Sequence, residues 1–538
     1  MRSVAIIGAG PSGLVTARWL KREGFEPIIF DQGDRLGGQW TGDSRYSGIW
    51  PSMRTNTSRL MTAFSDLAHE PKTFVYPTNQ TIQTYLQRYA EHFDLVSRLR
   101  LKTRIQEIDR DPERNGWLMR FIDDDRVSRE EAYSHVVVAT GRYNKPAIAP
   151  VPGLASFSGS GGIVHTFSYK QPESYRGLRV LVAGCSISAL EIASDLAMLG
   201  AARVISTNRR QRYVLHKLLA GVPLDHLAFT RFSALAEEHF PREVVAGALK
   251  AFITQSSGSP EQFGAPKPAD YVFDAGITQS QHFLPLVAEG RIETKPWMTE
   301  VNGKSVRFAD GSVEEVDTII FGTGYDLHLP FLSPAIKQTL DIDTLHADLY
   351  KFTFHPDLPG LSFAGMFDQI GPYFPTLELQ ARWIAYTWSG AVPQPSREQM
   401  HVGITAYRAR RGFPQATRMH IAAIHFAREA GVEPELERWP ELARTLFFGP
   451  LSPISFRLSG RDSLPDAPQR TLEDAFLFGA VPNSQLTFEQ CSRLQALAAA
   501  RNNAAFSLFV EQLTTASQYS DQRSSHCVRV EYKAQSKH

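Results

Sequence analysis

The feature that most constrains the fold is a glycine-rich turn that begins eight residues into the chain. An apolar run at residues 4–7 leads into Gly-Ala-Gly-Pro-Ser-Gly at residues 8–13, and a helical pattern follows as far as Gly24. A second apolar run at residues 27–30 ends at Asp31. Strand, G-x-G-x-x-G turn, helix, strand and acid in this order are typical of a dinucleotide-binding unit and predict an α/β fold.

Each glycine of this turn has a physical role in binding a dinucleotide. Gly8 permits the tight turn, Gly10 lets a pyrophosphate approach the backbone, and Gly13 lets the helix pack on the strand. The helix N-terminus offers free N–H groups to the pyrophosphate, and Asp31 lies where a carboxylate binds the adenosine ribose. A glycine turn without a nucleotide is the disfavoured alternative. The expected contacts of this first site are Gly8, Gly10, Pro11, Ser12, Gly13 and Asp31.

A second, degenerate copy of the unit begins with an apolar run at residues 180–183. Gly184 takes the first glycine position, Ser186 the second and Ala189 the third. A helical pattern and another apolar run follow, as in the first unit. The expected contacts of this second site are Gly184, Ser186, Ser188 and Ala189.

The two units differ where the first has its acid. That acid follows its first glycine by 23 residues, and the same step from Gly184 reaches Thr207. Two arginines, Arg209 and Arg210, come shortly after. A carboxylate would repel a 2′-phosphate, whereas guanidinium groups bind one through charge-assisted hydrogen bonds. The first site therefore favours FAD and the second favours NADPH; a solvated basic turn is the alternative for the arginine pair.

Two further buried-type strands each end in a Thr-Gly turn, one at Thr140 and Gly141 and the other at Thr323 and Gly324. Strands of this kind return the chain to the edge of a dinucleotide site. We therefore expect two Rossmann-like domains, the smaller inserted into the larger, followed by a mostly helical C-terminal extension. The expected divisions are an FAD-binding domain at residues 1–165 and 325–450, an NADPH-binding domain at residues 166–324, and an extension with a polar tail at residues 451–538.

Composition excludes several functional classes. The 538 residues include 57 Lys and Arg against 56 Asp and Glu, so the net charge of +1 would not attract nucleic acid or an anionic membrane. The cysteines are Cys185, Cys491 and Cys527, which offer neither a disulfide framework nor a C-x-x-C pair, and no metal site is expected. No apolar run reaches the ~18 residues of a membrane span. A cytoplasmic protein without a membrane anchor is predicted, and a homo-oligomer is left open.

Further motifs make the chain resemble the class B flavin-dependent monooxygenases, specifically the flavin-containing monooxygenases. The likeness extends over about residues 1–460 and leaves the remainder unplaced. The motifs that carry it are Gly-Gly-Gln-Trp at 37–40, Asn-Thr-Ser at 56–58, Phe-Gly-Ala-Pro at 263–266, the segment at 375–383 and Phe-Gly-Pro at 448–450.

The family's linker motif, Phe-x-Gly-x-x-x-His-x-x-x-Tyr/Phe, is shifted in this chain. His165 and Tyr169 fit it, but two extra residues separate the Phe-Ser-Gly at 157–159 from His165. Read strictly from the histidine, Gly161 is the motif's glycine. Related Baeyer–Villiger enzymes carry Trp-Pro or Trp-Asp where this chain has Tyr169 and Lys170, which favours oxygenation of a heteroatom.

The resemblance implies a monooxygenase that uses FAD, NADPH and O2. NADPH would reduce the flavin, O2 would add to give a C4a-(hydro)peroxyflavin, and one oxygen would pass to an amine nitrogen or a sulfide sulfur of a small molecule. The main alternative is a Baeyer–Villiger monooxygenase that converts a ketone to an ester. A disulfide reductase and a catalytically silent nucleotide-binding protein are weaker alternatives.

Asn56 is the predicted catalytic residue, because the resemblance places its amide near the flavin and NADP, where it would stabilise the oxygenated flavin. Its alternative is an ordinary turn asparagine. Asp368 is expected near the flavin at a helix start, or else as a helix cap, and Gln380 in the last flavin-side helix, or else as an ordinary polar residue. The other expected cofactor contacts are Gln39, Trp40, Thr140, Thr323 and Gly324.

The remaining polar residues receive structural roles. His165 is expected to position NADPH as part of the linker, and Cys185 to be a small filler of the second turn. His420 and His425 lack a metal-binding spacing and are expected to be ordinary helix residues. Residues 211–292 are rich in Phe, Leu and His and could form part of a pocket or a subunit contact.

Overall fold

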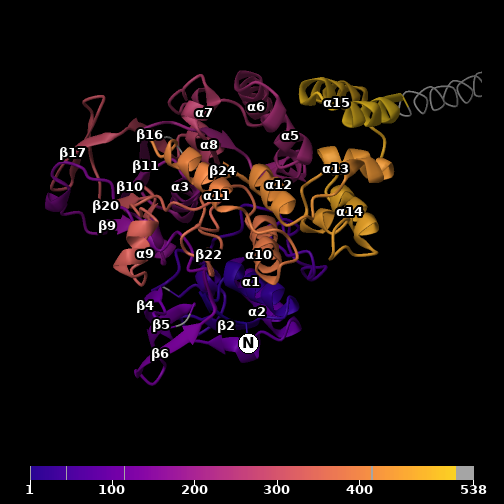
Figure 1. The fold of residues 1–538 in the computed structure, drawn as a ribbon. Helices are drawn as coiled ribbons and strands as arrows, with labels where there is room; N and C mark the ends of the chain where they lie inside the picture. The colour runs from indigo at the N-terminus through magenta and orange to yellow at the C-terminus, as the bar shows by residue number, and fades with distance from the viewer. Residues whose placement is uncertain (1, 44, 114, 413–415, 516–538) are drawn as a thin grey trace, which may run out of the picture.

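The computed structural model describes residues 2–43, 45–113, 115–412 and 416–515. Two five-stranded parallel sheets organise it (Figure 1). The first has the order β22-β7-β1-β2-β3, with β1 (Ser3–Ile7), β2 (Glu26–Phe30), β3 (Leu99–Arg100), β7 (His135–Val138) and β22 (Leu361–Phe363). The second has the order β16-β11-β10-β20-β9, with β9 (Gly162–His165), β10 (Arg179–Ala183), β11 (Arg203–Asn208), β16 (Glu293–Pro296) and β20 (Thr318–Phe321).

The central strand of the first sheet is buried on both faces, which explains its continuous apolar sequence. Val4 and Ile6 point toward a layer of helices, whereas Ala5 and Ile7 point toward the opposite face. The helical layer comprises α1 (Pro11–Arg22), α2 (Asn79–His92), α10 (Phe374–Ser389) and α12 (Met419–Glu429). The opposite face is covered by the antiparallel strands β4 (Arg104–Arg110), β5 (Trp117–Ile122) and β6 (Ser128–Tyr133).

The second sheet repeats this three-layer plan. Val180 and Val182 of β10 pack against α3 (Ile187–Leu199) and α8 (Phe283–Ala288). Leu181 and Ala183 pack against three antiparallel strands on the other face, β17 (Met298–Asn302), β18 (Ser305–Phe308) and β19 (Val313–Glu315). The chain then returns to the first sheet, because β22 pairs with β7 in parallel. An α/β fold is therefore confirmed.

The first expected domain boundary is wrong. Strand β9 pairs in parallel with β20, so residues 162–165 belong to the second sheet and not to the first unit, which was expected to end at residue 165. The glycines of the shifted linker motif explain the close approach. A Cβ on Gly161 would lie 1.7 Å from Thr318 Oγ1, and one on Gly159 would lie 2.5 Å from the Asp317 carbonyl oxygen.

Helices are inserted in the second unit and meet the C-terminal segment (Figure 1). Phe232 and Leu235 of α5 pack in one apolar cluster with α13 and α15. The insertion comprises α4 (Leu224–Ala228), α5 (Arg231–His239), α6 (Arg242–Ser257) and α7 (Val272–Ala275), and the C-terminal helices are α13 (Ala443–Phe448), α14 (Ala467–Phe476) and α15 (Phe488–Arg501). The polar tail expected at the C-terminus lies outside the described residues from 516 onward.

The remaining strands and α-helices are mostly short. They are β8 (Lys145–Pro146), β12 (Tyr213–Leu215), β13 (Leu218–Leu219), β14 (Val222–Pro223), β15 (Ile277–Gln279), β21 (Tyr325–Asp326), α9 (Pro334–Thr339), β23 (Gln369–Ile370), α11 (Arg397–Arg408) and β24 (Thr417–Arg418). Across the described ranges, every helix is too short or too polar to cross a bilayer.

Candidate functional site

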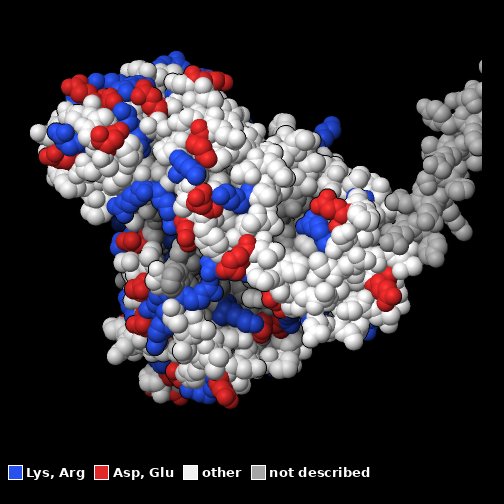
Figure 2. Space-filling model, turned by 90° about the horizontal axis from the view of Figure 1, so that it is seen from above, with Lys and Arg blue, Asp and Glu red and all other residues white. Residues whose placement is uncertain are grey.

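A cavity of about 2080 Å³ is lined by residues of both glycine turns, of the segment around Asn56 and of helices α4 to α6. A pocket for one small ligand usually measures about 300–1,000 Å³. This cavity is therefore large enough for more than one ligand. Its lining includes the arginines Arg35, Arg45, Arg104, Arg142 and Arg212. Figure 2 shows Lys and Arg side chains bordering a recess on the face seen from above.

The first turn is closed too tightly for any side chain at its first and third glycines. The Gly8 N–H donates to the Phe30 carbonyl at 2.7 Å, which joins the turn to the end of β2. Gly8 has φ +112°, and a Cβ there would lie 2.4 Å from the Ala139 carbonyl oxygen. A Cβ on Gly13 would lie only 1.9 Å from the Gly8 carbonyl oxygen.

Asp31 holds this turn from the end of β2. Its Oδ2 accepts from the Ala9 N–H at 2.7 Å, and its Oδ1 accepts from the Gly33 N–H at 2.7 Å. Burial raises the pKa of Asp31, although both backbone hydrogen bonds oppose that shift. The carboxylate lines the cavity, as the dinucleotide interpretation requires.

Two buried hydroxyls on the same part of the cavity wall support the fit of a dinucleotide. Ser12 Oγ and Thr140 Oγ1 have no hydrogen-bond partner within the described part of the chain. Both residues line the cavity. Because buried polar atoms are normally paired, a bound group with phosphate or hydroxyl oxygens would complete them. The residues present therefore fit FAD.

The second turn has the same backbone design. The Gly184 N–H donates to the Thr207 carbonyl at 2.8 Å, and a Cβ on Gly184, whose φ is +136°, would lie 2.5 Å from the Gly322 carbonyl oxygen. Thr207 is thus the counterpart of Phe30, and Asn208 is the counterpart of Asp31. The spacing of 23 residues therefore placed the counterpart of Asp31 at Thr207, one residue too early.

The arginines that were expected to bind a 2′-phosphate do not line the cavity. Arg209 and Arg210 are exposed, and the Arg209 guanidinium lies over the Trp297 ring at 4.7 Å. Arg212, just before β12, does line the cavity. Arg212 was not among the expected contacts, although it belongs to the same basic segment, because the sequence does not show in which direction each side chain points.

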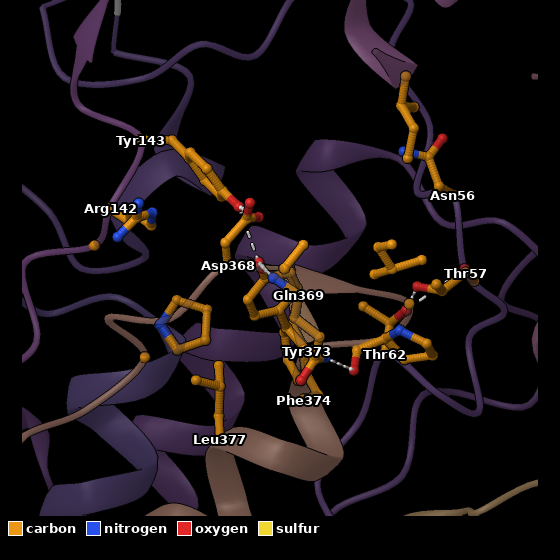
Figure 3. Close-up of a pocket in the computed structure, with 18 of the residues that line it drawn as sticks. Asn56, Thr57, Thr62, Arg142, Tyr143, Asp368, Gln369, Tyr373, Phe374 and Leu377 are labelled. Atoms are coloured by element: carbon orange, nitrogen blue, oxygen red, sulfur yellow. Dashed lines mark hydrogen bonds between the residues drawn. The ribbon is translucent and has the colours of Figure 1, made fainter. Parts of the chain in front are cut away.

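The Asn56 segment is held rigidly. The Thr55 N–H donates to the Pro77 carbonyl at 3.0 Å, and the hydroxyls of Thr57 and Thr62 lie 2.8 Å apart. Asn56 Oδ1 is buried without a hydrogen-bond partner among the described residues. Figure 3 shows Asn56 on one side of the cavity and Asp368 across from it. An amide fixed in this way can donate to or accept from a bound group without changing charge.

The loop that precedes Asn56 is fastened to the second unit. Trp50 Nε1 donates to Asp195 Oδ2 at 2.9 Å, and Lys170 Nζ donates to the Ile49 carbonyl at 2.7 Å. Burial lowers the pKa of Lys170 to about 8. Asn56 therefore lies at the junction of the two units.

Asp368 and Gln380 have different positions. Asp368 lines the cavity and accepts a hydrogen bond from the Tyr143 hydroxyl, which also contacts the Tyr373 hydroxyl (Figure 3). Gln380 is fully buried and does not line the cavity. Its Oε1 accepts from the Gly365 N–H at 2.8 Å, so it positions the segment that packs against Ser12.

Most residues expected to bind cofactors come together in the cavity, and the others do not line it. The residues that line it are Gly8, Gly10, Pro11, Ser12, Asp31, Gln39, Trp40, Asn56, Thr140, Ser186, Ser188, Gly324 and Asp368. Those outside its lining are Gly13, Gly184, Ala189, Arg209, Arg210, Thr323 and Gln380.

One part of the cavity, which we call the apolar arm, was not assigned to a site from the sequence. It extends from Asn56 along the inserted helices, within the segment expected to form a pocket or a subunit contact. His420 lies in α12, lines the cavity, and has its Nε2 2.8 Å from Glu237 Oε1. The apolar arm is lined by Leu224, Leu227, Phe229, Phe232, Val244, Leu249 and Phe252.

Comparison with known proteins identifies the family. The family described as "Flavin-binding monooxygenase-like" matches residues 1–474. The chain belongs to this family. Dimethylaniline monooxygenase [N-oxide-forming] 2 of Rattus norvegicus is 31% identical to it over 486 residues, which cover 86% of this chain and 89% of the relative. Human flavin-containing monooxygenase 2 is 30% identical, with 85% and 89% covered.

Solved structures agree with this flavin-binding monooxygenase fold. S-allyl-L-cysteine S-oxygenase from Allium sativum is 26% identical with a TM-score of 0.60, and 89% of this chain and 99% of that chain are covered. Cyclohexanone monooxygenase from Rhodococcus sp. Phi1 bound to NADP+ has a TM-score of 0.59 at 18% identity, with 80% and 97% covered, and shows the fold alone. The chain is thus a flavin-dependent monooxygenase that uses FAD and NADPH.

Proposed function

We propose that this enzyme oxygenates the nitrogen or sulfur atom of a small, largely apolar molecule where Asn56 faces the cavity. The position of Asn56 carries the proposal. Its amide, whose Oδ1 has no hydrogen-bond partner among the described residues, lines the same cavity as the two glycine turns and the apolar arm. The names of the relatives, an N-oxide-forming and an S-oxygenating enzyme, support a heteroatom as the acceptor.

In this proposal each of the two units binds one cofactor. The first turn, Asp31, Ser12 and Thr140 hold FAD, and the second turn holds NADPH. Arg212 is the guanidinium group that binds the 2′-phosphate, because it lines the cavity beside the second turn. The first unit returns after β20, so the NADPH-binding domain is an insertion that starts before β9.

Bound FAD, reduced by NADPH, supplies the oxygen chemistry. The chain supplies position and environment. Asn56 orients the reacting groups through its amide, whose segment is fixed by Thr57 and by Ser58. The apolar arm keeps water away from the reacting atoms, which reduces loss of activated oxygen as H2O2.

The test uses the purified holoenzyme with NADPH, O2 and a tertiary amine, a thioether or a ketone, and measures product formed per NADPH consumed. We expect N-oxide or S-oxide from the first two substrates. Asn56→Ala should lower the oxygenation rate by roughly 100-fold, the usual cost of one lost hydrogen bond to a reacting group, while H2O2 release rises and bound flavin is retained.

Asn302→Ala is the matched control, because Asn302 is exposed at the end of β17, outside the cavity lining. It should behave like the wild type. Ester formation from the ketone, with no oxide from amine or thioether, would replace the proposal with a Baeyer–Villiger activity. If Asn56→Ala forms as much product per NADPH consumed as the wild type does, Asn56 has no role in the reaction.

A further inference from the structure

A buried carboxyl group faces the cavity next to the Asn56 segment. Asp225 is in the first turn of α4 and is 2% exposed, yet it lines the cavity. Its Oδ2 accepts from the Ser58 N–H at 2.7 Å and from the Ser58 hydroxyl at 2.9 Å. Its Oδ1 has no hydrogen-bond partner in the described part of the chain. One oxygen is thus committed to the Asn56 segment, and the other is left for a bound group.

The chain provides this carboxyl group with no counter-ion among the described residues, where every ion pair within 4.0 Å involves other carboxylates. Two titratable groups among the described residues lie close to it: His226, whose Nε2 is 3.0 Å from the Ser58 hydroxyl, and Tyr76. Burial lowers the pKa of His226 to about 3, so its ring is neutral, and the pKa of Tyr76 is raised by burial and by Asp225. Burial raises the pKa of Asp225 itself to about 6.

A buried carboxylate without a counter-ion is costly, and a cation that enters the cavity would reduce that cost. The surrounding wall is apolar, with Leu224, Leu227 and Phe229 lining the cavity nearby. An alkylammonium ion matches this combination, since its chain fits the apolar arm and its N–H group can donate to Oδ1. A thioether has the same shape but neither charge nor N–H.

We propose that Asp225 is the substrate-binding residue that selects cationic alkylamines over neutral thioethers, by pairing with the ammonium group and taking up its proton. The inference rests on the proposed function. In the step, the N–H bond breaks and an O–H bond forms at Oδ1, so an ammonium ion and a carboxylate become a neutral amine and a carboxylic acid. The nitrogen lone pair is then free to accept oxygen, and nothing is oxidised or reduced in this transfer.

The test compares N,N-dimethyloctylamine with methyl octyl sulfide in the wild-type holoenzyme and in Asp225→Asn. Asparagine keeps an oxygen that can accept from Ser58, so the Asn56 segment is retained. We expect kcat/KM for the amine to fall by roughly 10- to 100-fold, the effect of one charge-assisted hydrogen bond, while the sulfide value changes less than about twofold. Asp225→Glu, which keeps the charge, should restore part of the amine preference.

The pH dependence gives a second readout. In the wild type, the ratio of amine to sulfide kcat/KM should fall as the pH is lowered through about 6, where Asp225 becomes protonated, and the ratio should be flat in Asp225→Asn. Asp474→Asn is the matched control, because burial raises the pKa of Asp474 to about 7 although that residue does not line the cavity. It should leave the ratio unchanged.

A measurement on the wild type alone guards against a variant that does not fold. Octyltrimethylammonium should inhibit sulfide oxygenation more strongly than its uncharged tert-butyl analogue, and less so below pH 6. Equal inhibition would overturn the proposal, as would an equal loss of amine and sulfide turnover in Asp225→Asn. Weaker NADP+ binding with an unchanged amine-to-sulfide ratio would assign the carboxyl group to the nicotinamide instead. If the wild type oxygenates neither substrate, the proposed function itself fails.

Discussion

The two glycine turns share one backbone design but differ in their side chains. In both, the first glycine has a positive φ, donates to the end of the next strand, and lies against the carbonyl of a third strand. The first turn adds Gly13 and Asp31, whereas the second has Ala189 and Asn208 at the corresponding places. The shared geometry explains why both turns can receive a dinucleotide, and in the proposal above the side chains determine which dinucleotide each turn selects.

The residue at the third glycine position of the turn differs between the two units, and so does the residue that follows the neighbouring strand. In the first unit, the third glycine position is Gly13 of α1, and the residue after β7 is Ala139. In the second unit, the third glycine position is Ala189 of α3, and the residue after β20 is Gly322. Ala139 and Gly322 are equivalent, because their N–H groups donate to the last residues of β1 and β10. A Cβ on Gly322 would lie 2.7 Å from Ala189 Cβ. The second unit therefore has room for the methyl group of Ala189 on the helix, because Gly322 after the neighbouring strand has none.

The largest effect is expected from Gly13→Ala. Its Cβ would lie 1.9 Å from the Gly8 carbonyl, and a backbone atom cannot move aside as a flexible side chain can. We expect the substitution to weaken the binding free energy of FAD by about 3 kcal/mol, which corresponds to roughly 100-fold weaker binding. Flavin content and the rate of flavin dissociation measure this effect. Ala189→Gly is the matched control and should retain flavin fully. A Gly13→Ala protein with normal flavin content would show that the turn is not the FAD site.

A smaller effect, on the KM for NADPH, should distinguish Arg212 from Arg210 near the second turn. Arg212 lines the cavity, so Arg212→Ala should raise KM for NADPH by roughly tenfold and leave the value for NADH nearly unchanged. Arg210→Ala, which removes an exposed guanidinium outside the cavity lining, is the control and should change either value less than about twofold. Steady-state kinetics with both nucleotides measure this difference. A loss confined to Arg210→Ala would support the original expectation from the sequence.

Local sequence was sufficient for features that depend on local geometry. The turn at residues 8–13, its helix and its two strands could be predicted because glycine positions and apolar runs determine them within about thirty residues. The corresponding register in the second unit could not, since α3 has 13 residues against 12 in α1 and the spacing alone does not show where the extra residue lies.

Features that depend on distant segments could not be predicted. Arg209 turns away to lie over Trp297, which comes from another strand region, and this leaves Arg212 to face the cavity. Gln380 contacts Gly365 and Thr353 through its amide, an arrangement that its own helix does not reveal. Asp225 meets Ser58 across 167 positions of sequence, so no local pattern identifies it.

The smallest effect is expected where the second turn has Cys185 and the first has Ala9. The Ala9 N–H donates to Asp31, but the second unit has no such acid, and Cys185 Sγ instead lies 3.7 Å from Gln211 Nε2. Burial raises the pKa of the Cys185 thiol, so it stays neutral and unreactive at ordinary pH. Cys185→Ala should therefore change KM for NADPH less than about twofold and stability by about 1 kcal/mol or less. Rapid alkylation of Cys185 by iodoacetamide at pH 8 in the folded holoenzyme, followed at that residue by mass spectrometry, would contradict its role as a filler.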